Sequence, residues 1–147
     1  MAYVCDARRL AHYVVDKCTE ERYPVSNLQL QKIMYFLQSV YCEATGQLLF
    51  EEEFEAWPYG PVLSDVYREF SSYGGGLICR NYDDFDPNML GAAKVFIDEG
   101  IQVLRQKSPW DLVATSHADG SPWSVVWNSG AGYKKTIPNN LICKSSS

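Results

Sequence analysis

A single long helix constrains the fold of this chain more than any other feature. Ser26 stands three residues before Gln29, the spacing of a capping box in which each side chain bonds the backbone amide of the other residue. Apolar residues then recur at helical spacing and form one face: Leu30, Ile33, Met34, Leu37 and Tyr41. Gly46 tolerates left-handed backbone and is a suitable stop. We predict a helix in this region, from Ser26 to about Gly46, that forms the centre of the hydrophobic core.

Shorter helices are predicted before and after this central helix in the sequence. The segment before it carries apolar side chains at helical spacing, among them Leu10 and Val14. Further along the chain, a capping residue followed by proline marks three helix starts: Asp86–Pro87, Ser108–Pro109 and Ser121–Pro122. Pro61 is expected to start another helix. The predicted helices cover residues 3–18, 61–70, 87 to about 104, 109–117 and 122–128.

The hydrophobicity pattern changes in residues 48–57. Apolar residues alternate there with three glutamates, which is typical of a half-buried strand: Glu51, Glu53 and Glu55. The segment from Trp57 to Pro61 follows as a rigid turn, because its two prolines fix φ and Gly60 permits an unusual backbone. We therefore predict a short strand within a small β-hairpin. The glutamates are interpreted as a solvated face rather than a metal site.

These elements predict a mainly α, α+β fold: a compact helical domain of about five to six helices with a small β-hairpin. A chain of 147 residues is long enough to bury a core without disulfides or metal ions. No repeat or interdomain linker interrupts it, so residues 1–147 are expected to form one domain. Residues 77–86 are predicted to be a loop with a second short strand, and residues 145–147 a disordered tail.

Charge and cysteine content limit the partners and the compartment. The net charge is −5, so the average surface repels phosphate backbones and nucleic acid is not expected as a partner. The obvious candidate for a local basic patch, Lys134 and Lys135, is interpreted as solvent-facing. The five cysteines include no C-x-x-C pair, which argues against a disulfide framework and a zinc site and predicts reduced thiols. Because no signal peptide or membrane span is recognisable, we expect a cytoplasmic protein without membrane contact.

Residues suited to catalysis are few. His12 lies in a polar stretch and is predicted to be exposed, whereas His117 lies at a helix end near Asp111, Ser116 and Asp119. Members of a Ser–His–Asp triad normally converge from separate segments, so His117 is interpreted as a helix cap or packing anchor. No phosphate-binding loop or pair of metal-ligating histidines occurs. We therefore predict a protein without enzymatic activity, cofactor or metal.

Aromatic residues near turns and helix starts are the alternative candidates for function. They are Trp57, Tyr59, Trp110, Trp123, Trp127 and Tyr133. Side chains of this kind serve either as core anchors or as binding hot spots. We interpret Trp110 and Trp123 as core anchors, and leave both roles open for Tyr59 and Trp127.

Three motifs resemble those of one protein family. Residues 27–36, Asn-Leu-Gln-Leu-Gln-Lys-Ile-Met-Tyr-Phe, look like the N-L-x-L-Q-K-L-L-Y-F helix of the Panacea antitoxin domain, also called SocA-like. Residues 54–62 resemble the E-A-W-x-Y-G-P-V turn of that family. His117, followed by Pro122 and Trp123, resembles its T-H-x(n)-P-W element. The motifs occur in the order found in the family, over residues 5 to about 142.

The resemblance implies a role in binding another protein. Members of the family are mostly helical, often lie in prophages or mobile elements, and neutralise unrelated toxins. Some act instead as proteolytic adaptors that deliver the toxin to an ATP-dependent protease. The expected function is therefore that of a non-enzymatic antitoxin whose partner is a toxin encoded nearby. The motifs leave direct masking, the adaptor mechanism and the oligomeric state open.

The residues expected to contact the partner lie in the last two motifs and around them: Trp57, Tyr59, Gly60, Pro61, Tyr67, His117, Trp123 and Trp127. Two other functions are kept as alternatives. One is a prophage-encoded regulator or counter-defence protein that binds a host factor through the same domain. The other is an enzyme that uses His117 with a carboxylate.

Overall fold

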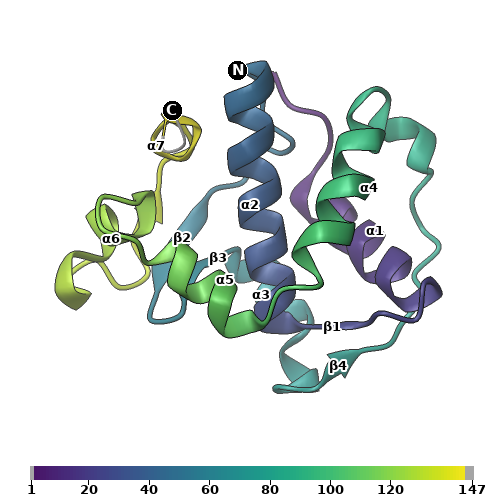
Figure 1. The fold of residues 1–147 in the computed structure, drawn as a ribbon, viewed down its shortest axis with the longest axis horizontal. Helices are drawn as coiled ribbons and strands as arrows, with labels where there is room; N and C mark the ends of the chain where they lie inside the picture. Colours follow the sequence, from purple (N-terminus) through teal and green to yellow (C-terminus); the bar gives the residue numbers. More distant parts are fainter. Residues whose placement is uncertain (1, 145–147) are drawn as a thin grey trace.

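The computed structural model describes residues 2–144 and places the long helix in the middle of the molecule (Figure 1). Helix α2 spans Asn27–Thr45. The capping box is confirmed: the Gln29 amide donates to Ser26 Oγ over 3.2 Å, and the Ser26 amide donates to Gln29 Oε1 over 3.0 Å. Gly46 ends the helix with φ +74°, as its tolerance of left-handed backbone predicted. The tail predicted to be disordered, residues 145–147, lies outside the described residues.

The first helix begins later than predicted. Helix α1 spans Ala7–Glu20, and Asp6 caps it by accepting a hydrogen bond from the Arg9 amide over 2.8 Å. The residues before Asp6 run beside the segment that follows α2, where the amides of Val4 and Cys5 donate to the Leu49 carbonyl. A capping side chain therefore decides where this helix starts, although the apolar spacing continues further back.

A small antiparallel sheet contains the predicted hairpin. Strands β2 (Phe54–Trp57) and β3 (Gly60–Val62) are joined by a two-residue turn, and β5 (Thr136–Ile137) pairs with the other edge of β2. The prediction that Pro61 starts a helix was wrong. Pro61 lies in β3, and α3 covers Ser64–Glu69. A separate pair, β1 (Val25–Ser26) with β4 (Leu77–Ile78), confirms the second short strand expected within residues 77–86.

Residues 48–53 are irregular rather than part of the strand. The apolar half, Leu48 to Phe50, is buried throughout, so the alternation of a strand is absent. The glutamates that follow are exposed, yet two of them have partners: Glu52 accepts from the Ala7 amide over 2.9 Å, and Glu53 accepts from the Asn139 amide over 2.8 Å. Both amides begin helices, where a carboxylate is favoured. These two side chains therefore act as helix caps.

The remaining helices largely follow the starts marked by proline. Ser108 and Ser121 cap α5 and α6 as predicted, each by accepting an amide hydrogen bond. After Asp86 the prediction holds only in part, because a 3-10 turn stops at Gly91 before α4 begins. The bounds are Pro87–Leu90 for that turn, Ala93–Leu104 for α4, Pro109–Ser116 for α5, Pro122–Trp127 for α6 and Asn139–Lys144 for α7, with 3-10 turns at Ser71–Tyr73 and Asn128–Gly130. In the part of the chain that the structure describes, seven α-helices and small antiparallel sheets confirm the α+β fold class. None of the helices in residues 2–144 has the length and apolar character that crossing a membrane requires.

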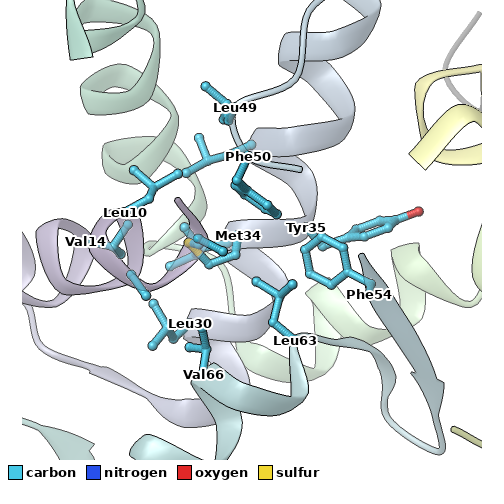
Figure 2. Packing of buried hydrophobic residues seen from close by; sticks show 14 of the residues in the cluster. Leu10, Val14, Leu30, Met34, Tyr35, Leu49, Phe50, Phe54, Leu63 and Val66 are labelled. Carbon is cyan, nitrogen blue, oxygen red and sulfur yellow. The ribbon is translucent and has the colours of Figure 1, made fainter. Parts of the chain in front are cut away.

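The hydrophobic core lies around α2 (Figure 2). Leu10 of α1 packs into the same buried cluster as Met34 of α2, and Phe50 and Phe54 extend that cluster towards the sheet. All four side chains are completely buried. Complete burial of a large apolar side chain contributes about 1.5–3 kcal/mol to folding. The core thereby fixes α2 against the segments on both of its sides.

A disulfide joins Cys42 of α2 to Cys143 of α7, 101 residues further along the chain. The prediction of reduced thiols was therefore wrong for this pair. Spacing along the sequence does not reveal that α7 returns to α2, where the two Cα atoms lie 5.2 Å apart. Cys5, Cys18 and Cys79 are free, as predicted.

Candidate protein-binding site

Two motifs that are far apart in the sequence meet at the β2–β3 hairpin. The indole Nε1 of Trp123, in α6, donates to the Trp57 carbonyl in β2 over 2.7 Å. The His117 ring, at the end of α5, stacks on Trp123 with ring centroids 3.7 Å apart and planes 5° from parallel. The structure therefore joins the two regions from which the sequence predicted a partner-binding patch.

Further aromatic rings extend this stack. Trp127 lies 5.3 Å from Trp123, with nearly parallel planes, and Tyr133 contacts Trp127 edge-on at 6.1 Å. Trp57 lies 6.5 Å from Tyr133 and 5.0 Å from Tyr67. We call this set the aromatic cluster: Trp57, Tyr67, His117, Trp123, Trp127 and Tyr133. Offset and edge-on ring pairs each contribute about 0.5–1.5 kcal/mol beyond the area that they bury, so the cluster is a preorganised unit.

The predicted contact residues differ in what they can offer a partner. Gly60, Pro61 and Trp123 are buried, so they shape the site without providing contact surface. The other aromatic members of the prediction are half-buried: Trp57, Tyr67, His117 and Trp127. Tyr59 is 58% exposed at the tip of the hairpin and is the most accessible of the predicted residues.

Trp110 was interpreted as a core anchor, and that interpretation was wrong. Its side chain is 62% exposed in the first turn of α5, and its ring contacts Tyr59 edge-on at 5.7 Å. The same interpretation is confirmed for Trp123, which is 7% exposed. An exposed pair of aromatic rings therefore lies beside the hairpin turn, where the sequence suggested only one.

Tyr133 and Lys134 were not among the predicted contact residues. The Tyr133 side chain is half exposed, and Lys134 Nζ lies 5.6 Å from the centroid of Trp57 and 5.4 Å from that of Tyr133. These are cation–π distances. The adjacent tyrosine and lysine were the sequence signal for a contact site here. The sequence did not show that this segment returns to the hairpin through β5.

A buried lysine lies under the hairpin. Lys32 of α2 is completely buried, and its Nζ donates to the Pro61 carbonyl over 2.7 Å. Burial lowers the pKa of this ammonium group to about 7, because the charged form loses its hydration. Gly60 leaves the space that Lys32 fills: a Cβ there would lie 2.7 Å from both Lys32 Cε and Ser116 Oγ, and φ is +108°. Gly60 and Pro61 therefore lock the hairpin onto α2 and α5.

Amide side chains of α2 fix the neighbouring backbone in a similar way. Gln31 Oε1 accepts from the Leu63 amide over 2.9 Å, and Asn27 Nδ2 donates to the Tyr67 carbonyl over 3.1 Å. On the other side, Gln38 Nε2 donates to the carbonyl of Phe50 over 2.7 Å. Buried amides that satisfy buried backbone groups stabilise one arrangement of the chain. The conspicuous polar residues of this helix therefore position the hairpin rather than contact a partner.

His117 has the features of a packing residue. Burial lowers its pKa, with a smaller contribution from the charge of Lys32. Its Nε2 is buried and has no hydrogen-bond partner among the described residues, while Ser116 Oγ donates to the Val113 carbonyl instead. Asp111 and Asp119 are exposed. The sequence neighbours of His117 therefore do not assemble into a triad around it.

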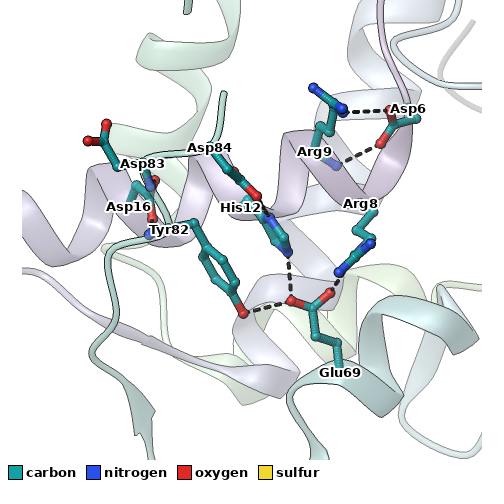
Figure 3. A network of polar contacts seen from close by, with 9 residues as sticks. All are labelled: Asp6, Arg8, Arg9, His12, Asp16, Glu69, Tyr82, Asp83 and Asp84. Carbon is teal, nitrogen blue, oxygen red and sulfur yellow. Dashed lines mark hydrogen bonds and ion pairs between the residues drawn. The ribbon is translucent and has the colours of Figure 1, made fainter. Parts of the chain in front are cut away.

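A polar cluster surrounds His12 (Figure 3). The prediction that His12 is exposed was wrong. The ring is 3% exposed and lies between two carboxylates, with Nε2 2.6 Å from Glu69 and Nδ1 2.8 Å from Asp84. Tyr82 stacks on the ring at 3.6 Å and donates its hydroxyl to Glu69 over 2.6 Å. Burial raises the pKa of Glu69, but hydrogen bonds from Tyr82, His12 and Arg8 outweigh it and hold the pKa below its usual value.

This cluster ties the loop before α4 to α1. Besides the contacts of His12, Asp16 accepts hydrogen bonds from the amides of Tyr82 and Asp83, over 2.6 and 2.9 Å. Both ring nitrogens of His12 are occupied by carboxylates, so neither is available to a substrate. Within residues 2–144 no group of His, Cys, Asp and Glu is placed to hold a metal ion. The cluster around His12 therefore has a structural role: it holds the loop before α4 against α1.

Comparison with known proteins identifies similar sequences. The sequence profile of the family described as antitoxin SocA-like, Panacea domain, matches residues 30–124. The antitoxin SocA of Caulobacter vibrioides (strain NA1000 / CB15N) is 36% identical over 135 residues, which cover 84% of this chain and 71% of that protein. No solved structure shows a significant match to the chain. The family match contains α2 from Leu30 onward, the hairpin and the His117–Trp123 pair, while Trp127 and Tyr133 lie beyond it.

Proposed function

Because the chain belongs to the family of SocA-like, Panacea-domain antitoxins, we propose that it neutralises a cognate toxin by binding it directly. The observation that carries this proposal is the exposed pair of Tyr59 and Trp110 beside the aromatic cluster. Two large rings left in water next to a preorganised aromatic unit are typical of a surface that a protein partner covers. The cytoplasm, as the compartment of that encounter, stays a prediction.

The chemistry of this surface favours a protein partner. Tyrosine and tryptophan bury a large area for little loss of side-chain entropy, and their polar atoms can still donate hydrogen bonds. Here the hairpin turn is held by Lys32 and Trp123, so it need not be ordered when the toxin binds. Preorganisation of this kind increases affinity because less freedom is lost on association.

Growth rescue tests the proposal. The protein is co-expressed with the toxin encoded beside its gene, and the Tyr59→Ala/Trp110→Ala variant is compared with Tyr3→Ala. Tyr3 is 51% exposed and lies outside the aromatic cluster, so it is the control for loss of an exposed ring. We expect the double variant to melt at the wild-type temperature and to lose rescue, with toxin affinity reduced at least about thirtyfold, or 2 kcal/mol. Equal rescue by both variants would refute this surface.

The fate of the toxin separates masking from the adaptor mechanism. If the protein masks the toxin, a stoichiometric complex accumulates and the amount of toxin is unchanged during rescue. If it delivers the toxin to an ATP-dependent protease, the amount of toxin falls and recovers when the protease is inactivated. A host protein that binds the same surface, together with the absence of a neighbouring toxin gene, would support the regulator or counter-defence function instead.

The enzymatic alternative predicts a different result. His117→Ala should then abolish function while the melting temperature and toxin affinity remain at their wild-type values. Since His117 stacks on Trp123 and its Nε2 has no partner among the described residues, we expect the substitution to lower stability or binding instead.

A further inference from the structure

A second candidate surface is formed by residues other than the Tyr59–Trp110 pair. It is a groove of about 800 Å³ between α2, α4 and α5. Figure 1 shows α4 on one side of α2 and α5 on the other. Apolar side chains from all three helices line the groove, among them Phe36, Val40, Phe96, Val103, Leu104 and Leu112. Gly100 lets α4 approach α2 closely at its base, since a Cβ there would lie 2.5 Å from a methyl group of Leu37.

The groove is open and continues beyond α5. Val40 on α2 is 46% exposed and Val103 on α4 is 58% exposed, so the described residues leave both edges uncovered. A smaller hollow of about 300 Å³ adjoins it and shares Phe36, Val40 and Thr115. The two hollows meet at these shared residues and follow α5 from Asp111 to Ser116 and on to Asp119, a shape that suits an extended segment better than a compact small molecule.

Charges at these hollows are mostly negative. Glu99 lies on α4 and Asp111 on α5 at the groove, and Asp119 lies at the adjoining hollow. None of the three forms an ion pair with any residue that the structure describes. The single cation at the groove is Lys107. Unpaired carboxylates beside an apolar floor attract a partner that carries positive charge next to apolar side chains.

We infer that this groove binds an amphipathic helix of a partner protein, whose apolar stripe is flanked by lysine or arginine residues. A helix presents apolar side chains at i, i+3, i+4 and i+7, which suits a groove lined by apolar side chains of α2, α4 and α5. Its flanking cations would meet Glu99 from one wall and Asp111 from the other. The inference rests on the proposed function, since it names the chemistry of the toxin segment that this antitoxin would cover.

The same charges disfavour the other occupants of an apolar groove. A fatty acid would bring its carboxylate to a rim with three negative groups and one positive group. A second copy of this chain, with net charge −5, would place like charges opposite each other in a symmetric contact. A basic amphipathic helix satisfies both the apolar floor and the acidic rim.

Fluorescence anisotropy with defined peptides tests the inference on the whole chain. The probe is a labelled helical peptide of about 18 residues, or five turns, with a leucine stripe flanked by lysines. One control peptide has glutamate in place of every lysine, and another has the same composition with the stripe scrambled. Binding is measured for the wild type, for Val40→Gln/Val103→Gln and for Val95→Gln/Val125→Gln.

The two double variants are matched. Each replaces two exposed helical valines by a neutral polar residue that helices tolerate, so neither changes the charge. Val95 and Val125 are 66% and 57% exposed and do not line the groove. A third variant, Glu99→Lys/Asp111→Lys, reverses the rim charge, and its control is Glu51→Lys, an exposed carboxylate outside the groove.

We expect the lysine peptide to bind the wild type and the control Val95→Gln/Val125→Gln with equal affinity. It should bind Val40→Gln/Val103→Gln at least about tenfold more weakly. The glutamate peptide and the scrambled peptide should each bind the wild type at least about tenfold more weakly than the lysine peptide does. The Glu99→Lys/Asp111→Lys variant should bind the glutamate peptide more tightly than the lysine peptide. Equal affinities of the two valine variants, or no charge preference, would overturn the inference. So would saturable binding of oleate, or a concentration-dependent dimer that Val40→Gln/Val103→Gln abolishes, in place of peptide binding.

This test is independent of the growth rescue. Peptide binding without rescue would show a helix-binding groove in a protein that is not a functional antitoxin. Rescue without peptide binding would keep the antitoxin function and remove the groove from it.

Discussion

Lys32 combines complete burial with a single strong hydrogen bond to the hairpin. Its Nζ donates to the Pro61 carbonyl, and no described carboxylate forms an ion pair with it. A charged amine in this position loses its hydration without gaining a counter-ion, which is why its pKa falls to about 7. The hairpin is therefore held most strongly when this amine is neutral.

This environment predicts how stability depends on pH. The folded-state pKa of Lys32, about 7, lies below the unfolded value of 10.5, so between them the unfolded chain binds more protons. The free energy of unfolding should therefore rise with pH above about 7, by up to about 1.4 kcal/mol per pH unit from this group. Urea unfolding of the wild type and Lys32→Met from about pH 6 to pH 9 measures it. We expect the wild type to gain on the variant as pH rises, whereas parallel curves would contradict the buried amine.

Residues whose role is local could be predicted from the sequence, whereas those that act over a distance could not. The Ser26 capping box involves residues three apart, so the pattern contains both partners. Lys32 and Gln31 lie beside an apolar stripe and resemble solvent-facing positions. They are buried where Pro61 and Leu63 lie against this face of α2, and helical periodicity carries no signal for such packing.

At the scale of elements, the same distinction explains which boundaries were predicted. α5 and α6 start at a serine–proline pair, a signal contained in two adjacent residues. The start of α1 combines the local cap Asp6 with Glu52, which is 45 residues from the Ala7 amide that it accepts from, and the start of α7 involves Glu53. The candidate site divides similarly: the hairpin turn and His117 could be found from motifs, whereas the exposure of Trp110 depends on how α5 packs against β3.

The loop before α4 should depend on His12. Removing this buried ring in His12→Ala leaves Glu69 and Asp84 without their shared partner, and we expect a loss of about 3 kcal/mol in the free energy of unfolding. Faster hydrogen exchange should be concentrated in residues 79–86. Arg8→Ala is the matched control, because it removes another partner of Glu69 from a side chain that is 73% exposed. In Arg8→Ala the free energy of unfolding should fall by less than about 1 kcal/mol. An equal loss in both variants would contradict the structural role of His12.

Across the whole molecule, α5 contributes to two surfaces of different chemistry. Trp110 of α5 pairs with Tyr59, and Asp111 and Leu112 of the same helix line the apolar groove with its acidic rim. The C-terminal segment completes the first surface only: Tyr133 and Lys134 reach Trp57 before β5 pairs with β2. Loosening this segment should therefore weaken toxin binding at the hairpin and leave the groove intact.

The Cys42–Cys143 disulfide gives a way to loosen that segment. It links residues 101 apart, and cross-links over long loops typically stabilise by about 2–4 kcal/mol because the unfolded chain loses freedom. We expect Cys143→Ser to lower the free energy of unfolding by this amount and a dithiol reductant to do the same to the wild type, without further effect on the variant. Cys79→Ser, at an exposed free thiol, should change nothing. If reductant destabilised Cys143→Ser as much as the wild type, the disulfide would not be its target. If the loss occurred but toxin affinity stayed unchanged, Tyr133 and Lys134 would be held by β5 and the aromatic cluster alone.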